Sequence, residues 1–577
     1  MNYIDWIVLA TTLVFIVVYG VWKTRGSRNI EGYLLSDNNM KWGTIGLSIM
    51  ATQASAITFL STPGQAYTDG MGFVQFYFGL PIAVVLICAT LVPIYHKLKV
   101  FTAYEYLEQR FDIKTRLLTS LLFMVSRGLA AGITIYAPAI ILSTIIDLPL
   151  NATILIIGLL VVIYTVSGGT KAVSQTHKQQ MAVIFVGMLV AFIVLMNLIS
   201  RNMAMGEVFA LAGHLGKMEI VDFSLDLSNR YTIWSGIFAG VVLHASYFGA
   251  DQSQVQRYLG GATVAESRIG LLFNGLLKVP MQFFILLVGV MVFVFYQFVQ
   301  PPVFFNEQEI LKVRNSQYAG DFDVLNRQHQ DIFQEKRNKI EQLVGALERD
   351  SESEIAVFSR DVRALEQDSD EVHQQVAELI AANDPTAETK DADYIFIGFI
   401  TRYLPHGLIG LLIAVIFSAA MSSTSAELNA LASTTIIDYY KRLFKREASD
   451  QHYLIASKLF TAMWGILAIL FALFSSLLDN LIQAVNILGS LFYGVILGIF
   501  VLGFVFKYVR GNAVFIAAII GEGIVFLLWM LSESGAIALS YLWLNIIGCL
   551  LAVGLGLLIQ LLLNNLNPGK RKKPSLN

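Results

Sequence analysis

Charged residues and cysteines are scarce in this sequence, and both shortages narrow the class of protein. Only 14% of the 577 residues are charged and 55% are hydrophobic, whereas about a quarter of a soluble domain is charged. The two cysteines, Cys88 and Cys549, lie inside apolar runs, which excludes a disulfide framework or a cysteine-based metal motif. The net charge of −2 gives no general attraction to nucleic acid. The composition therefore indicates a protein embedded in a lipid bilayer.

Apolar runs of roughly 20 residues recur along the chain, and this length crosses about 30 Å of hydrocarbon as a helix. Lipid offers the backbone no hydrogen-bond partner, so each run is expected to be helical. We therefore predict an all-α, multi-pass protein of the cell membrane (inner or plasma membrane) with thirteen transmembrane spans. The spans are expected near residues 3–22, 42–67, 72–95, 117–147, 150–166, 178–200, 231–250, 269–300, 406–437, 453–478, 481–506, 512–532 and 541–563.

Lysine and arginine are distributed unevenly among the connections, and this bias predicts the orientation. Clusters of basic residues occupy alternate connections, for example 441–446 and 570–573, whereas the short connections on the other side carry only Arg201, Lys217 and Arg230. Because basic connections stay in the cytoplasm, we expect the N-terminus outside and the C-terminus, with its short basic tail, inside.

One connection is long, polar and acidic. Residues 303–392 contain 20 of the 42 acidic residues, yet stretches within 340–365 show the apolar spacing of helices. We expect a charged helical hairpin on the extracytoplasmic face, serving either as a solvated insertion or as a docking surface for an extracytoplasmic partner. The predicted organisation is a first membrane part over 1–302 (spans 1–8), this insertion, and a second membrane part over 393–577 (spans 9–13).

Two spans contain more small and hydroxylated residues than a lipid-facing helix needs. These residues gather between Gly43 and Gly64 in the second span and between Phe417 and Asn429 in the ninth. Packing explains a single serine in such a helix, but a run of them at mid-membrane depth indicates an interrupted helix whose freed carbonyls line a cavity or bind an ion. Oxygen ligands suit a hard cation such as Na⁺. No P-loop sequence occurs, so transport would depend on an ion gradient.

Five motifs, taken together, resemble the sodium/solute symporter family, nearest its iodide, monocarboxylate, multivitamin and bacterial sialic acid carrier branches. They are Ser55-Ala-Ile-Thr58 with Thr62-Pro63, Thr102-Ala-Tyr104-Glu105-Tyr-Leu-Glu-Gln-Arg110-Phe111, Tyr164-Thr-Val-Ser-Gly168-Gly169, Asp251-Gln252-Ser-Gln-Val-Gln256-Arg257-Tyr258 and Met421-Ser422-Ser423. The resemblance covers nearly everything outside 303–392. It implies a LeuT-like fold of two inverted five-helix repeats, spans 2–6 and 7–11, with a small-molecule solute near the midplane. It also implies Na⁺-coupled import by alternating access.

The resemblance further implies a sodium site. By position its ligands would be the carbonyls of Ala51 and Ala54 and, on the ninth span, Ala419, Ser422 and Ser423. The three ninth-span residues are spaced i, i+3 and i+4, so they share one helix face.

Some members of the family hold a second sodium ion with an acid and a further hydroxyl. His177 and Ala426 stand at those positions here, and neither is a good Na⁺ ligand, so we expect one Na⁺ per cycle. His177 is left with either a hydrogen-bonding role near the inner interface or a proton-linked role.

Positions that match solute contacts of the family are Gln53, Ser55, Thr58, Phe73, Tyr77 and Gln483. Each of these side chains also suits an interhelical hydrogen bond or a packing contact. Ile57 and Tyr77 replace polar groups of the glucose-type members, which disfavours a neutral hexose.

Arg127 lies mid-span, where a charge is costly and indicates a functional site. It matches the arginine that pairs with the solute carboxylate in sialic acid carriers, and its planar fork suits a carboxylate. A structural ion pair or a carbonyl clamp is the alternative.

The predicted function is therefore Na⁺-coupled symport of a small carboxylate such as sialic acid or a monocarboxylate. The alternatives are uptake of a neutral sugar-like or amino-sugar solute, and a non-transporting sensor on the same fold. An enzyme is not expected, because we expect intramembrane acids to be nearly absent and no paired carboxylates to face one cavity.

Overall fold

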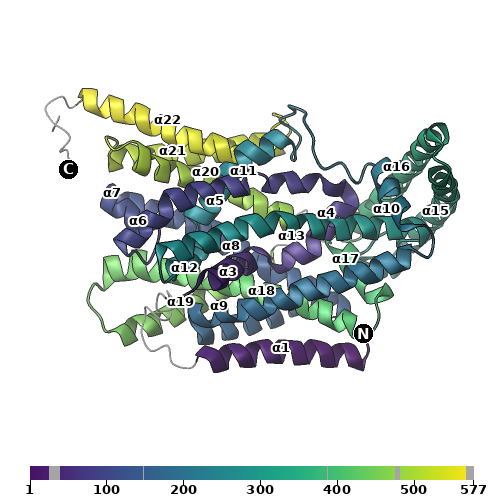
Figure 1. Cartoon of the computed structure of the whole chain (residues 1–577), viewed down its shortest axis with the longest axis horizontal. Coiled ribbons are helices and arrows are strands. Elements are labelled where there is room, and N and C mark those ends of the chain that lie inside the picture. Colours follow the sequence, from purple (N-terminus) through teal and green to yellow (C-terminus); the bar gives the residue numbers. More distant parts are fainter. Residues whose placement is uncertain (25–38, 147, 386, 475–480, 567–577) are drawn as a thin grey trace.

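The computed structural model describes residues 1–24, 39–146, 148–385, 387–474 and 481–566. These residues form a bundle of helices (Figure 1), and nine of the helices they contain are long and apolar enough to cross a membrane. Three shorter apolar helices accompany them. The all-α, multi-pass architecture is therefore confirmed. The count of thirteen spans is not confirmed, because residues 150–199 form one helix where two spans were predicted.

The helices of the described chain follow one another in two groups. Up to residue 302 they are α1 (Tyr3–Thr24), α3 (Trp42–Gln53), α4 (Ala56–Asp69), the 3₁₀ helix η2 (Gly70–Tyr77), α5 (Leu80–Ala89), α6 (Leu91–Leu98), α7 (Tyr104–Arg110), α8 (Ile113–Ile146), α9 (Leu150–Ile199), α10 (Met205–His214), the π-helix η3 (Ser235–Ala239), α11 (Gly240–Gly249), α12 (Gln252–Leu259) and α13 (Val264–Phe298). Beyond it they are α14 (Glu307–Arg314), α15 (Ala319–Glu348), α16 (Glu352–Asn383), α17 (Ala392–Tyr403), α18 (Leu408–Thr434), the π-helix η4 (Thr435–Phe444), α19 (Asp450–Ala472), α20 (Leu481–Val505), α21 (Gly511–Glu533) and α22 (Trp543–Leu566).

Two spans are interrupted inside the bundle. The second predicted span divides into α3 and α4 at Ala54 and Ser55. The seventh was predicted to end at residue 250, but α12 follows α11 after a break at Ala250 and Asp251, so this helix continues beyond the predicted boundary. The Asp251 side chain caps the N-terminus of α12 by accepting a hydrogen bond from the Ser253 amide. The first helix of each predicted repeat is therefore broken, an arrangement that suits two repeats of the same design.

Close packing holds α4 in place beyond its break. A Cβ atom on Gly64 would lie 2.0 Å from the carbonyl oxygen of Ala392 in α17, and one on Gly289 of α13 would lie 2.2 Å from the carbonyl oxygen of Pro63. Only glycine allows such an approach, so α4 is packed directly against the backbones of α13 and α17.

Helices α15 and α16 pack side by side as a hairpin that projects from one end of the bundle (Figure 1). Lys336 and Glu366 link the two helices through an ion pair of 2.6 Å, and the Arg363 guanidinium donates to the carbonyl of His214 in α10. The N-terminus lies at the same end as the hairpin, and α22 ends at the opposite end (Figure 1). The predicted topology puts the N-terminus and the hairpin on one side of the membrane and the C-terminal tail on the other, and the positions of these segments agree with it. Which end faces the cytoplasm stays a prediction.

Candidate functional site

The break between α3 and α4 exposes backbone oxygens to the interior of the protein. Ala54 and Ser55 have non-helical backbone angles (φ −84°, ψ 74° and φ −76°, ψ 174°), and no side chain caps the start of α4. The polar groups of an interrupted helix must find partners inside the protein, because lipid supplies none. The interruption predicted from the small and hydroxylated residues of this span is thus present. The ninth span, which has the same kind of residues between Phe417 and Asn429, is instead the continuous helix α18.

Oxygen atoms from α18 meet the end of α3 at this break. The hydroxyls of Ser422 and Ser423 lie 3.2 Å and 3.5 Å from the carbonyl oxygen of Ala51. The Ser423 hydroxyl is also 3.1 Å from the carbonyl oxygen of Ala419, and Ala54 lies at the break itself, fully buried. Four of the five predicted ligand residues therefore form one cluster of uncharged oxygens, a donor set that suits a hard monovalent cation.

His177 and Ala426, the positions where a second sodium site was expected to be lost, lie on helices that meet at this cluster. His177 of α9 is fully buried, and its Nδ1 atom lies 2.9 Å from the Ser48 hydroxyl, one turn before Ala51 in α3. Ala426 is buried and contributes no oxygen from its side chain. These placements accord with the expectation of one Na⁺ per cycle, which stays a prediction.

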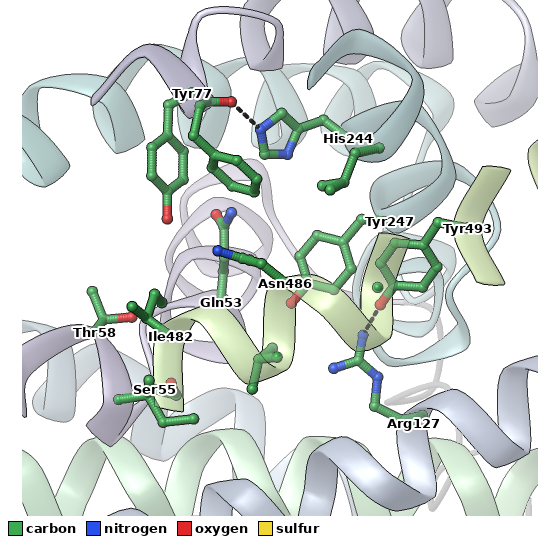
Figure 2. A pocket seen from close by; sticks show the side chains of 15 residues that line it. Gln53, Ser55, Thr58, Tyr77, Arg127, His244, Tyr247, Ile482, Asn486 and Tyr493 are labelled. Carbon is green, nitrogen blue, oxygen red and sulfur yellow. Dashed lines mark hydrogen bonds between the residues drawn. The ribbon is translucent and has the colours of Figure 1, made fainter. Parts of the chain in front are cut away.

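A cavity of about 80 Å³ adjoins the break (Figure 2). Its lining comes from α3, α4, η2, α8, α11 and α20. The lining residues are Gln53, Ser55, Ile57, Thr58, Phe76, Tyr77, Arg127, Leu243, His244, Tyr247, Ile482, Val485, Asn486, Gly489 and Tyr493. Five predicted solute-contact residues are among them, namely Gln53, Ser55, Thr58, Tyr77 and Arg127.

Two predicted residues lie outside this lining. Phe73 is buried in an aromatic cluster, with its ring centroid 5.6 Å from that of Phe76 and 5.1 Å from that of Tyr231. Gln483 donates from its Nε2 atom to Gln65 Oε1 over 3.1 Å. In this conformation Phe73 supports the cavity wall from behind, and Gln483 bonds to α4.

The structure adds polar lining residues that the sequence reading missed. Asn486 of α20 extends toward Gln53, and His244 lies beside Tyr77 (Figure 2). The Asn486 Nδ2 and Gln53 Oε1 atoms are buried without a hydrogen-bond partner, so the cavity presents an unmatched donor and an unmatched acceptor. The sequence signal that could have identified His244 and Asn486 is that each is a polar residue inside an otherwise apolar span.

Arg127 lies at the far side of the cavity from Tyr77 and is bonded to two carboxylates (Figure 2). Its Nε atom lies 3.0 Å from Asp251 Oδ2, its Nη1 atom lies 3.0 Å from Glu427 Oε1, and Nη2 contacts both Asp251 and the Tyr493 hydroxyl. Neither carboxylate is among the residues that line the cavity, but both are buried acids that the sequence reading did not place beside Arg127. Asp251 reaches Arg127 because it sits at the α11–α12 break, and Glu427 reaches it from α18.

A second cation lies behind the cavity wall. Lys278 of α13 is fully buried, its Nζ atom has no hydrogen-bond partner, and it lies 5.5 Å from the centroid of the Tyr77 ring. A cation at this distance from an aromatic ring is attracted by the ring face, but no carboxylate in the described part of the chain forms an ion pair with Lys278. Lys278 was not predicted, since its burial depends on how α13 packs.

The sequence matches a known protein family. The model of the sodium:solute symporter family matches residues 33–318 and 376–521. The human sodium/iodide cotransporter is 32% identical over 297 residues, which are 51% of this chain and 45% of that protein, so the chain spans less than half of this relative. The mouse sodium-coupled monocarboxylate transporter 2 is 26% identical over 509 residues, which are 88% of this chain and 69% of that protein.

A solved structure shares the fold. A Na⁺-coupled sialic acid symporter in a substrate-bound outward-open state superposes with a TM-score of 0.73 over 97% of this chain and 98% of its own, at 23% identity. That likeness supports the fold alone, whereas the family match covers well over half of the sequence. The chain is a multi-pass protein of the plasma membrane, and it belongs to the sodium:solute symporter family.

Proposed function

We propose that this protein is a Na⁺-coupled secondary active symporter that imports a small carboxylate by alternating access. The observation that carries the proposal is the oxygen cluster at the α3–α4 break, where the Ala51 carbonyl lies 3.2 Å from Ser422 and 3.5 Å from Ser423. Backbone carbonyls and hydroxyls in this arrangement replace the hydration shell of Na⁺. The cluster adjoins the cavity directly, because Gln53 and Ser55 line the cavity on either side of Ala54.

Coupling follows from this adjacency. Na⁺ bound between Ala51 and the α18 hydroxyls would fix the broken helix against α18 and so shape the cavity face formed by Gln53, Ser55 and Thr58. Two ligands couple only when each favours the same conformation. Loss of Na⁺ on the low-sodium side would release α3 from α18 and lower the affinity for the solute.

The buried charges near the cavity support an anionic solute. Arg127 is paired with Asp251 and Glu427, whereas Lys278 forms no ion pair with any of the described residues. Bound Na⁺ adds a positive charge to this medium of low dielectric constant, and an anionic solute offsets that charge whereas a neutral sugar does not.

The solute carboxylate has two possible anchors in the cavity. Arg127 uses most of its donors on Asp251, Glu427 and Tyr493, while Lys278 has no anionic partner and is separated from the cavity by the Tyr77 ring. A cavity of about 80 Å³ holds only a few waters, at about 10–15 Å³ each. A short monocarboxylate is therefore the first solute to test.

The α15–α16 hairpin is an addition to the transport fold. The family match omits residues 319–375, which comprise α15 and most of α16. Its helices contact α10 and α13 rather than the cavity. We propose an extracytoplasmic location for the hairpin, where a partner could dock without affecting solute binding.

Reconstitution of the full chain into proteoliposomes tests the proposed function. An inward Na⁺ gradient is expected to drive accumulation of a radiolabelled short monocarboxylate, and an equal K⁺ gradient is not. Sialic acid and a hexose serve as competing solutes to define the class. Uptake that is indifferent to Na⁺ would contradict symport, and Na⁺-dependent binding without accumulation would favour a sensor.

A further inference from the structure

Arg257 is a buried cation without a counter-ion. The side chain is fully buried on α12, where its Nε atom lies 3.3 Å from the Ser253 carbonyl oxygen and its Nη1 atom lies 3.4 Å from the Ser174 hydroxyl. Its Nη2 atom has no hydrogen-bond partner, and none of the described residues forms an ion pair with it. Guanidinium stays protonated in proteins, so this side chain keeps its charge wherever it lies.

The other buried arginines of the described chain are neutralised. Arg127 is paired with Asp251 and Glu427, and Arg116 lies 2.7 Å from Glu108 and 2.6 Å from Asp438. Burial of a charge is strongly unfavourable unless an opposite charge and hydrogen bonds compensate it. Arg257 departs from this pattern, because none of the described carboxylates forms an ion pair with it.

Hydrogen-bonding side chains of α9 and α3 continue from Ser174, the residue that Arg257 contacts through Nη1. The Ser174 hydroxyl of α9 lies 3.3 Å from the Ser48 hydroxyl of α3, and Ser48 lies 2.9 Å from the Nδ1 atom of His177. The Nε2 atom of His177 is buried without a partner. Hydroxyl and ring N–H groups can turn toward an anion, so this group, together with Arg257, offers several donors and no carboxylate.

We propose that the Arg257 pocket, formed by Arg257, Ser174, Ser48 and His177, binds a small monovalent anion. Its chemistry fits either chloride or the carboxylate of a solute on its way out of the cavity. The pocket lies on the α3 side of the helix break, away from Thr58 and the start of α4. It is therefore a site separate from the solute cavity, whose lining contains none of the four residues.

The pocket is close enough to the sodium cluster to influence it. Ser48 precedes Ala51 by three residues, a rise of about 4.5 Å along α3, and Thr52 next to Ala51 donates to the Ser48 carbonyl over 2.8 Å. An empty pocket leaves Arg257 repelling Na⁺, whereas a bound anion cancels that repulsion. Anion and Na⁺ should therefore raise each other's affinity by the same factor.

Thermal unfolding of the purified full chain tests the site without any transport assay. At fixed Na⁺, replacement of gluconate by chloride is expected to raise the unfolding temperature in a saturable way. Arg257→Gln should remove this response, while Ser433→Ala, which removes a buried hydroxyl bonded to its own helix, should keep it. A wild-type protein indifferent to chloride, or an Arg257→Gln variant that responds as the wild type does, would overturn the proposal.

Acetate in place of chloride distinguishes the two sources of the anion. Stabilisation by acetate that Arg257→Gln removes indicates a site that accepts the solute carboxylate in transit, and stabilisation by chloride alone indicates an inorganic anion; either result supports the pocket. Should Arg257→Gln not fold, Ser174→Ala is expected to raise the half-saturating chloride concentration several-fold, and an unchanged value would overturn the proposal. Na⁺-driven uptake reports the proposed function separately, whatever the chloride result.

Discussion

Arg127 and Arg257 are both buried in the helical bundle, but the protein compensates their charges in different ways. Arg127 lies between Asp251 and Glu427, each 3.0 Å from one of its nitrogens, so its positive charge is compensated within the protein. Arg257 touches only a carbonyl and a hydroxyl, at 3.3 Å and 3.4 Å. The first is a closed internal network that holds α8, α12 and α18 together, and the second is an open site that requires an external ligand.

This difference separates a structural use of buried charge from a binding use. A complete ion-pair network stabilises one arrangement of helices, and removal of one member leaves the others uncompensated. An unpaired cation is unfavourable for folding and favourable for anion binding. The two arginines should therefore respond in opposite directions when each is replaced.

The largest effect is expected at Arg127. Arg127→Met leaves Asp251 and Glu427 without an ion-pair partner, so the free energy of unfolding should fall by about 3–5 kcal/mol. Denaturant unfolding in detergent measures the loss. Arg127→Met combined with Glu427→Gln removes one of the orphaned charges and should recover part of the stability. A single variant as stable as the wild type would show that the network is not structural.

A smaller effect, with the opposite sign, is expected at Arg257. In a chloride-free buffer Arg257→Gln should leave the unfolding temperature unchanged or raise it, because the variant no longer buries an unpaired charge. The same unfolding assay compares it with Arg127→Met. A loss of stability as large as that of Arg127→Met would remove the distinction between the two arginines.

A local effect that depends on pH is expected at Glu388, a buried acid in the segment before α17. Its hydrogen-bond donors among the described residues are two tyrosine hydroxyls. Tyr394 donates to the Oε2 atom over 2.7 Å, and Tyr136 donates to it over 3.5 Å. Burial raises the pKa of Glu388 to about 8, above the value of about 4.3 in an unfolded chain. Unlike Arg257, this unpaired group can lose its charge by binding a proton.

The sign of the pH effect follows from that shift. The folded state holds the Glu388 proton between about pH 4.3 and pH 8, so its contribution to stability is complete below that window and lost as the pH rises through about 8. The unfolding temperature of the wild type should fall by a few degrees across the window relative to Glu388→Gln. If the unfolding temperatures of the two proteins change with pH in the same way, Glu388 is not the group responsible.

The sequence predicted those features that depend on neighbouring residues. Apolar runs predicted the spans, and the small and hydroxylated residues around Ala51 predicted the interruption at Ala54 and Ser55. The i, i+3, i+4 spacing placed Ala419, Ser422 and Ser423 on one face of α18, where the last two reach the Ala51 carbonyl. Local patterns suffice for such features because helix periodicity converts spacing into direction.

Contacts between distant segments could not be predicted in this way. Arg127 and Asp251 are 124 positions apart, and Arg127 and Glu427 are 300 apart, so their network depends on how the helices pack. Asp251 was expected to lie in the connection after the seventh span. Its position became clear only from the break before α12, where it is the N-cap residue. The burial of Lys278 likewise follows from the position of α13, which no spacing within that helix reveals.

Direct binding of radioactive sodium to the purified protein tests the central claim, that Na⁺ binds where α3 is interrupted beside α18. The double variant Ser422→Ala with Ser423→Ala removes both hydroxyls, and Ser433→Ala removes a buried hydroxyl farther along α18 that bonds only to its own helix, at 2.9 Å from the Ala430 carbonyl. The wild type and Ser433→Ala should bind Na⁺ alike, and the double variant should bind it at least about tenfold more weakly, a loss of about 1.4 kcal/mol, while still folded. Equal binding by all three proteins would contradict the account.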